Sequence, residues 1–121
     1  MQKQNQDCIF CQIIAGKIPP GKGKVYDDEN FIGILDLHPK VEGHTLIIAK
    51  NHYKTLLDIP THLGNELQEA IKTISLNLIK EEKAAGVNVL SNIGETAGQV
   101  IHHCHIHIIP RKKDDGIQVL S

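Results

Sequence analysis

Residues 102 to 111 read HHCHIHIIPR, and this stretch decides the fold. Four of the eight histidines of the chain lie within six of its positions. Successive side chains of a β-strand point to opposite faces, so the pattern predicts a strand over residues 102–109 with two unlike faces. One face carries His102, Cys104, Ile106 and Ile108, and the other carries His103, His105 and His107.

Three imidazoles on one face can serve as metal ligands, as general acids or bases, or as nucleophiles. A solvated polar strand face is the alternative without chemistry. The spacing alone also fits a purely metal-binding triad, since His-x-His is a common pair of zinc ligands. The mostly apolar opposite face is expected to pack against a helix.

Composition excludes several classes of protein. The 121 residues have a mass of 13.4 kDa, which predicts one domain over residues 1–121. The absence of tryptophan, with only two tyrosines and two phenylalanines, leaves no aromatic platform for stacking bases. A net charge of −1 without a basic block argues against nucleic-acid and electrostatic membrane partners. No apolar run is long enough to span a bilayer.

The number of cysteines and the N-terminal sequence indicate the cellular compartment. Three cysteines, an odd number, do not form a disulfide framework. Residues 1–14 lack the long apolar region and small-residue cleavage site of an export signal. We therefore expect a reduced, cytoplasmic protein.

Periodicity and turn residues predict the remaining elements. Apolar residues recur at steps of three and four along one long helix, residues 62–84, with Gly86 as its expected cap. The other expected elements are a short helix at 8–15 and strands at 24–28, 31–37, 44–50 and 87–92. Strands in succession with one packing helix indicate an α+β fold with an antiparallel sheet.

The segment GQVIHHCHIHIIPR, residues 98–111, closely resembles the signature of the histidine triad (HIT) superfamily of nucleotide hydrolases and transferases. Three further blocks resemble the same family in the same order: CIFCQIIAGKIP at 8–19, KVYDDENFIGILDLHPKVEGHTLIIAKNH at 24–52 and NVLSNIGETAGQ at 88–99. The resemblance implies a HIT-like fold, with a five-stranded antiparallel sheet, one long helix and a short N-terminal helix.

It also implies an enzyme. In such proteins the middle histidine, here His105, attacks the α-phosphate of a purine nucleoside phosphoramidate or a dinucleoside polyphosphate. A covalent nucleotidyl-histidine forms and is hydrolysed, which divides one difficult displacement into two easier ones. His107 would contact phosphate oxygens and His44 would support the site, while His103 completes the catalytic set. As an isolated residue, His44 could equally cap an element or lie at the edge of the core.

The nucleotide-binding positions implied by the resemblance are Asp36, Leu37, Asn92, Gly98, Gln99, Val100, His105 and His107. Asp36 would accept hydrogen bonds from ribose hydroxyls, although a lone aspartate at a strand end is often a turn residue. Asn92 and Gln99 match positions that touch the phosphate or the leaving group. Val100 departs from the family, in which many members carry Ser or Thr there. The chain therefore lacks a hydroxyl that can assist the leaving group.

Cys8 and Cys11 lie three residues apart, on one face of a short helix or turn. A structural zinc site requires four ligands, and the resemblance supplies His52 and His103. Two buried thiols acting as small hydrophobes, or a redox pair, are the alternatives. Cys104, on the apolar face, is expected to be buried in the core.

The resemblance finally implies a homodimer in which two sheets join into one. Two other functions stay open: a nucleotide-binding regulatory module with little turnover, and a protein whose histidines only bind metal.

Overall fold

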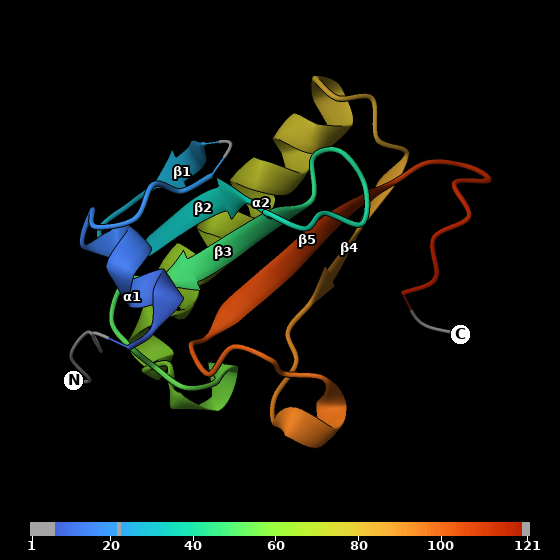
Figure 1. Ribbon diagram of the computed structural model, residues 1–121. Coiled ribbons are helices and arrows are strands. Elements are labelled where there is room, and N and C mark those ends of the chain that lie inside the picture. The colour runs from blue at the N-terminus through green and yellow to red at the C-terminus, as the bar shows by residue number, and fades with distance from the viewer. Residues whose placement is uncertain (1–6, 22, 120–121) are drawn as a thin grey trace.

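The computed structural model describes residues 7–21 and 23–119, and its strands form one antiparallel sheet in the order β1-β2-β3-β5-β4 (Figure 1). The elements are α1 Ile9–Ile14, β1 Lys24–Asp27, β2 Phe31–Leu35, β3 Thr45–Ala49, the 3₁₀ turns η1 Leu56–Asp58 and η2 Thr61–Leu63, α2 Gly64–Lys80, β4 Gly86–Leu90, the 3₁₀ turn η3 Glu95–Ala97, and β5 His105–Arg111. This arrangement confirms the predicted α+β fold. Residues 1–6, part of the segment in which no export signal is expected, lie outside the described residues.

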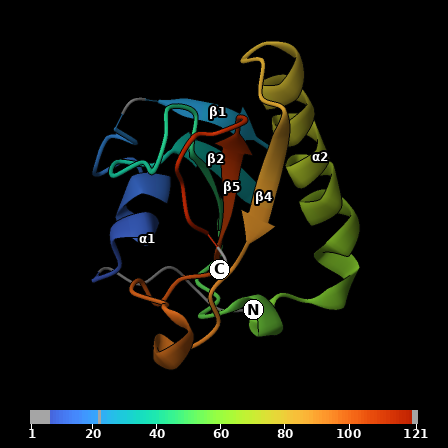
Figure 2. The same cartoon turned by 90° about the vertical axis from the view of Figure 1, so that its right-hand side faces the viewer.

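The two helices lie on opposite faces of the sheet (Figure 2). Helix α2 packs Ala70, Ile74 and Leu78 against one face. That face contributes Phe31, Ile47, Cys104, Ile106 and Ile108 to the same core. Cys104 is buried there, as predicted.

The opposite face is shared between a second core and the histidines. Phe10 and Ile13 of α1 pack against Ile32, Ile34, Leu46 and Ile48. Strands β2 and β3 are accordingly buried on both faces, which explains their almost unbroken apolar sequences. The histidines of β5 lie beside this second core, so that face is only partly open.

Strand β5 begins later than the sequence predicts. Its first residue is His105, not His102, and it extends to Arg111. The chain before it is diverted because the Cys104 N–H donates to the Tyr53 carbonyl at 2.6 Å. His102 is therefore exposed near Glu95, at 3.6 Å, and the expectation that it shares the apolar face with Cys104 is wrong.

Helix α2 is shorter than predicted, spanning residues 64–80 in place of 62–84. The chain reverses at Lys83, whose φ of 62° is left-handed, and the Ala84 N–H then donates to the Leu78 carbonyl at 3.1 Å. This turn buries Ala84 in the core, and Gly86 starts β4 rather than capping the helix. Among the described residues, no helix is both long enough and apolar enough to cross a membrane.

Gly33 sets how closely α2 approaches the sheet. A Cβ atom at this position would lie 2.9 Å from Ile74 Cδ1 and 3.0 Å from Tyr26 Cβ. A side chain at this position would therefore require Ile74 or Tyr26 to shift. The glycine inside this strand therefore has a packing role.

Candidate active site and metal centre

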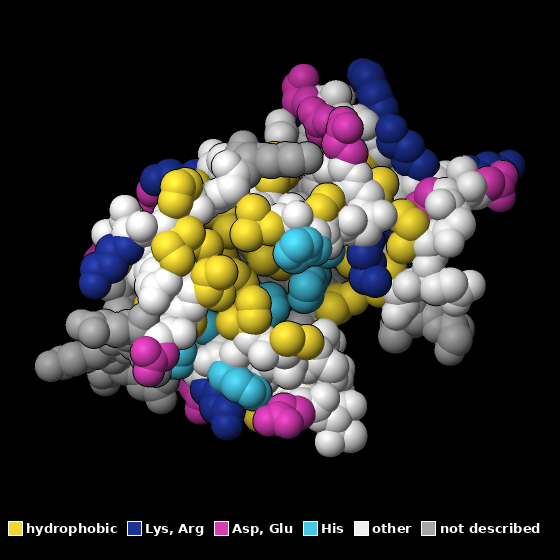
Figure 3. Space-filling view, in the orientation of Figure 1, with side chains coloured by type: hydrophobic (Ala, Val, Ile, Leu, Met, Phe, Trp, Pro, Cys, Tyr) yellow, Lys and Arg dark blue, Asp and Glu magenta, His cyan; other side chains and the backbone are white. Residues whose placement is uncertain are grey.

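The side chains of His103, His105 and His107 lie on the side of the sheet away from α2. Their apolar neighbours Cys104, Ile106 and Ile108 belong to the core under α2, so the predicted alternation is present. Figure 3 shows histidine side chains gathered next to hydrophobic ones near the centre of the molecular face. The rings of His105 and His107 are 5.1 Å apart between centroids.

The ring of His105 donates its N–H to a backbone carbonyl. Its Nδ1 lies 2.7 Å from the carbonyl oxygen of His103. A carbonyl can only accept, so Nδ1–H donates and Nε2 retains its lone pair. Burial lowers the pKa of His105 below the usual histidine value, while the bond to His103 and the charge of Asp36 act in the opposite direction. At neutral pH the side chain is an uncharged imidazole with a free Nε2.

His44 and His107 form a directed hydrogen-bond relay. The Lys40 N–H donates to His44 Nδ1 at 3.1 Å, which places the proton of His44 on Nε2. His44 Nε2 lies 3.0 Å from His107 Nδ1, so it donates to that atom. The proton of His107 is consequently on Nε2. Burial, assisted by the neighbouring His105 and His44, lowers the pKa of His107 to about 4.

This relay excludes one metal site. Asp36, His44 and His107 bring one ligand atom each within 4.8 Å of one another. His44 Nδ1 accepts from a backbone N–H, so its Nε2 carries a proton and has no lone pair for an ion. Asp36 Oδ2 instead lies 3.4 Å from His44 Nε2. His44 and His107 are thus hydrogen-bonded to each other, and Asp36 lies beside them.

Asp36 and Leu37 follow β2 at the edge of the site. Asp36 Oδ1 accepts from the His38 N–H at 3.0 Å, which is also the geometry of a turn residue. Leu37 is exposed. Their binding of a ribose stays a prediction.

The loop between β4 and β5 contains the other predicted nucleotide-binding residues. Gly94 and Gly98 have φ values of 92° and 103°, which L-residues rarely adopt. Asn92 Nδ2 approaches the Gly98 carbonyl at 3.4 Å. Val100 is 85% exposed, so its side chain lies at the surface of the loop.

Gln99 holds this loop from inside. Its side chain is buried, donates to the carbonyls of Lys54 and Ile101 at 2.8 and 3.0 Å, and accepts from the Gly94 N–H at 2.9 Å. Its own N–H donates to the Gly94 carbonyl. Both hydrogens of the side-chain NH₂ group and its carbonyl oxygen thus have partners within the protein. Gln99 positions the loop, and the expectation that its side chain touches a ligand finds no support in this geometry.

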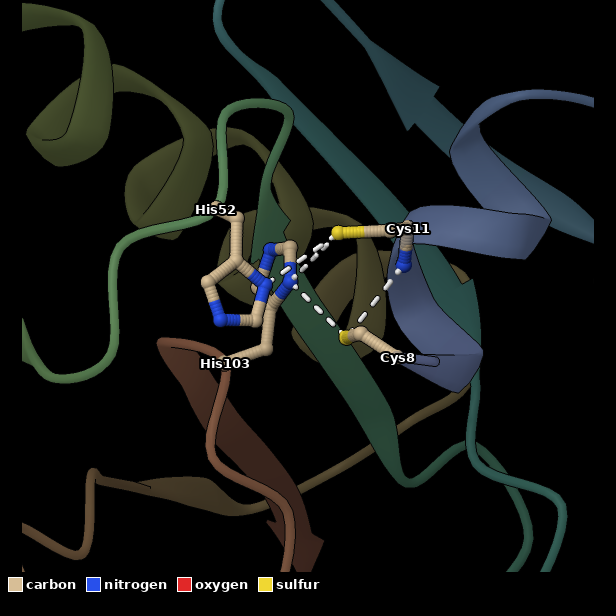
Figure 4. A group of neighbouring side chains, drawn as sticks. All are labelled: Cys8, Cys11, His52 and His103. Atoms are coloured by element: carbon tan, nitrogen blue, oxygen red, sulfur yellow. Dashed lines mark hydrogen bonds between the residues drawn. The ribbon is translucent and has the colours of Figure 1, made fainter. Parts of the chain in front are cut away.

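Cys8, Cys11, His52 and His103 converge although they come from distant parts of the chain (Figure 4). Sulfur and Nδ1 atoms lie 3.2 Å apart for Cys8 and His103, and 3.2 Å apart for Cys11 and His52. Cys11 Sγ and His103 Nδ1 are 3.5 Å apart. Tetrahedral zinc with Zn–S bonds of about 2.3 Å and Zn–N bonds of about 2.0–2.1 Å separates its ligand atoms by about 3.3–3.8 Å. The donor set therefore fits such an ion.

His103 is preset for this role. Its Nε2 lies 2.6 Å from the Ala49 carbonyl and donates to it, leaving the Nδ1 lone pair toward the cysteines. Burial lowers the pKa of His103 to about 4, so the ring is neutral, as a metal ligand must be. The carbonyl of the same residue holds His105.

The sequence did not predict that Phe10 and Lys40 contact the histidines of the site. The buried ring of Phe10 packs edge-on against His103 and His105, with centroid distances of 5.8 and 5.1 Å. The position of Phe10 between Cys8 and Cys11 in the sequence could have indicated that its ring lies near the site. Lys40 acts on His44 through its backbone, which residue type cannot reveal.

Residues 21–114 match the family described as HIT domain. The chain is 42% identical to "Protein hit" of Bacillus subtilis (strain 168), with 92% of the chain and 76% of that protein covered. It is 44% identical to "Adenylylsulfatase HINT3" of Arabidopsis thaliana, covering 90% of the chain and 54% of that protein. It is 37% identical to "Adenosine 5'-monophosphoramidase HNT1" of Candida albicans, covering 88% of the chain and 72% of that protein.

Solved structures agree with the fold. SMU.412c of Streptococcus mutans UA159 superposes with a TM-score of 0.90 at 38% identity, covering 100% of this chain and 76% of that one. A Zn-bound histidine triad family protein of Mycobacterium smegmatis superposes with a TM-score of 0.84 at 35% identity, covering 93% of this chain and 80% of that one.

Proposed function

The chain belongs to the HIT family, and from this premise we propose that it hydrolyses purine nucleotide conjugates at the α-phosphate, with His105 as the nucleophile. The substrate class comprises nucleoside phosphoramidates and dinucleoside polyphosphates. Relatives named adenylylsulfatase and adenosine 5'-monophosphoramidase support nucleotide hydrolysis in general.

The observation that carries the proposal is the orientation of His105. The His103 carbonyl holds the Nδ1 proton, so the Nε2 lone pair is the nucleophilic atom. Burial keeps the ring neutral at physiological pH. A protonated imidazole, by contrast, would have no lone pair to offer.

The reaction then consists of two displacements at phosphorus. The Nε2 lone pair forms an N–P bond while the bond from phosphorus to the leaving group breaks, and the leaving group takes that electron pair. An amine also takes up a proton. Water next attacks phosphorus, the N–P electrons return to Nε2, and the proton of water is released. The products are the nucleoside monophosphate and the free leaving group.

Other residues assist by binding the phosphate. His107 would donate its Nε2–H to a phosphate oxygen, because the relay from Lys40 through His44 places the proton there. The loop held by Gln99 would bring backbone N–H groups near the same oxygens. Asp36 and Leu37 would contact the ribose. The imidazolium formed at His105 would remain bonded to the His103 carbonyl.

Rapid quench with adenosine phosphoramidate, followed by mass spectrometry, tests the proposal. We expect a nucleotidyl adduct on His105 and loss of turnover in His105→Asn, with nucleotide affinity largely retained. His62→Asn, at an exposed histidine in η2, is the matched control. Turnover that survives in His105→Asn would exclude the assigned nucleophile. Tight nucleotide binding without an adduct would favour the regulatory module, an alternative that the missing hydroxyl at Val100 supports.

We also propose that Cys8, Cys11, His52 and His103 bind a structural zinc ion. The distances, the neutral His103 and the Zn-bound relative support this. Zinc would tie α1 to the segment before β5 and fix the carbonyl that orients His105. The alternative of a redox pair is less compatible with two histidine nitrogens lying 3.2 Å from the sulfurs.

Metal analysis of purified variants tests the ligand set. We expect about one zinc per chain in the unaltered protein and in Cys104→Ala, whose thiol lies in the core under α2. Cys11→Ala should contain much less. Unchanged zinc in Cys11→Ala would mean that the ligands are wrong.

A homodimer through β4 completes the proposal. Strand β4 lies at the edge of the sheet, and Val89 on it is 44% exposed. Leu76 and Ile79 of the neighbouring α2 are 41% and 40% exposed. A two-fold partner would pair the edge and cover these side chains. Because the zinc site needs reduced thiols, we place the protein in the cytoplasm.

A further inference from the structure

A pocket of about 550 Å³ lies on the β4 side of the proposed active site. His107 and Asn92, both predicted nucleotide-binding residues, form part of its wall. Lys40, Asn88 and Gln118 also line it. Among the described residues that line this pocket, none carries a carboxylate. Within this described lining, the formal charge is the positive one of Lys40.

The polar groups of the pocket are set as hydrogen-bond donors. His107 carries its proton on Nε2, as the relay through His44 requires. Arg111 Nη1 donates to Asn88 Oδ1 at 2.7 Å, so the NH₂ group is the part of that amide left for another partner. Arg111 itself is held by Asp115 through two bonds of 2.9 Å. Donors and a cation without a competing carboxylate suit an anion.

The ammonium group of Lys40 acts electrostatically on the site. Its charge contributes to the lowering of the pKa values of both His44 and His107, beneath the larger effect of burial. Its backbone N–H holds His44 independently of the side chain. The side chain can therefore be changed without removing the hydrogen bond that orders the relay.

Two positions of the loop provide no free hydroxyl for a leaving group. Val100 stands where many members of the family carry Ser or Thr, and the Ser91 hydroxyl donates to the His105 carbonyl at 2.8 Å. His107 is neutral, and a neutral imidazole is a very weak acid. An amine needs a proton to depart, whereas sulfate or a phosphate chain departs as a stable anion. The site chemistry thus favours a leaving group that is already anionic.

We propose that the pocket lined by Lys40 and Asn88 binds an anionic leaving group, and that Lys40 selects sulfate or phosphate conjugates of AMP over phosphoramidates. The inference rests on the proposed hydrolysis at the α-phosphate and narrows its substrate class. Lys40 and Asn88 would contact the departing group while His107 contacts the α-phosphate.

Paired kinetics on two substrates provide the test. Adenosine 5′-phosphosulfate releases sulfate, and adenosine phosphoramidate releases ammonia from the same nucleotide. In Lys40→Gln we expect kcat/KM for the phosphosulfate to fall about three- to tenfold, the size of one partly exposed charge pair. The value for the phosphoramidate should stay within about twofold. Lys40→Glu should widen the difference, while Lys72→Gln, on the exposed side of α2, should change neither value.

A binding comparison separates this inference from the proposed hydrolysis. In the His105→Asn background, ADP carries a β-phosphate in place of the leaving group and AMP carries none. We expect calorimetry to show tighter binding of ADP than of AMP, and Lys40→Gln to abolish that preference. An unchanged preference, or equal losses on both substrates, would overturn the role of Lys40. If neither conjugate is hydrolysed, the proposed function fails, and the ADP and AMP affinities alone decide whether the pocket selects anions.

Discussion

Three atoms of His103 are engaged, each in a different kind of contact. Nδ1 faces Cys8 and Cys11, Nε2 donates to the Ala49 carbonyl, and the backbone carbonyl accepts from His105. The ring has no freedom to adopt another tautomer. The proposed metal centre and the proposed nucleophile thus share one residue.

The hydrogen-bond relay predicts that substitution of His44 slows the proposed reaction. In His44→Phe, the Nε2–H that holds His107 Nδ1 is absent, so His107 can take either tautomer. We expect kcat to fall about 10- to 100-fold, as for other residues that orient a functional group, with a smaller change in KM. Nitrogen NMR should show a mixture of His107 tautomers. His38→Phe, at an exposed position, is the control, and an unchanged His107 spectrum would contradict the relay.

Buried neutral histidines also predict a pH dependence of stability. The pKa of His107 is about 4 in the folded protein and 6.5 without the fold. Between these values the unfolded chain binds more protons, so the free energy of unfolding should be fully present above pH 6.5 and decrease as the pH falls toward 4. Urea unfolding across this range measures it. In His107→Phe the free energy of unfolding should depend less steeply on pH than in the unaltered protein. In His62→Phe the pH dependence should be unchanged. Equal dependences would exclude His107 as a source.

On the scale of elements, the loop before β5 is as important as the strand. Gln99 satisfies three backbone groups from inside the loop. Gly94 and Gly98 supply the left-handed conformations that let the loop close around it. The strand presents the histidines, and the loop determines what can approach them.

Gln99→Ala should therefore loosen the loop. The substitution leaves the Gly94 N–H and the carbonyls of Lys54 and Ile101 without their partner. We expect a loss of about 2–3 kcal/mol in the free energy of unfolding, because buried polar groups would be unsatisfied. Hydrogen exchange at Gly94 should accelerate. Asn92→Ala, which loses only a 3.4 Å contact, should cost much less stability. Similar stabilities of the two variants would refute the assigned role of Gln99.

For the whole molecule, the proposed zinc site predicts how α1 is held. Helix α1 has six residues, too few for an isolated helix to be stable. It is attached by its apolar contacts and by the four convergent ligands. Removal of zinc with a chelator should lower Tm by roughly 10 °C or more. The same chelator should have little effect on Cys11→Ala. A chelator-insensitive Tm in the unaltered protein would argue against a structural metal.

The proposed dimer predicts a change of mass on one substitution. Val89→Lys places a charge on the exposed side of the edge strand β4. We expect light scattering to give twice 13.4 kDa for the unaltered chain and 13.4 kDa for the variant. Val25→Lys, at an exposed valine of the opposite edge strand β1, should remain dimeric. A monomeric unaltered chain would refute the proposal.

Local patterns in the sequence predicted the main elements and the candidate site residues. Alternation along the strand predicted over residues 102–109 placed His103, His105 and His107 on one face, and the three-to-four spacing placed α2 against the other. Residue chemistry and family resemblance predicted Cys8, Cys11, His52 and His103 as one ligand set, and the structure brings these four side chains together. These features depend on side-chain type and short-range period, which the sequence contains directly.

Only the tertiary structure decided the rest, because it depends on backbone atoms that are the same in every residue. The Tyr53 carbonyl diverts the chain before β5, the Ala49 and His103 carbonyls fix two tautomers, and the Lys40 N–H orients His44. The inward Gln99 and the pocket beside Lys40 likewise arise from contacts between distant segments. A carbonyl or an N–H acquires a specific role only when folding brings a particular side chain to it.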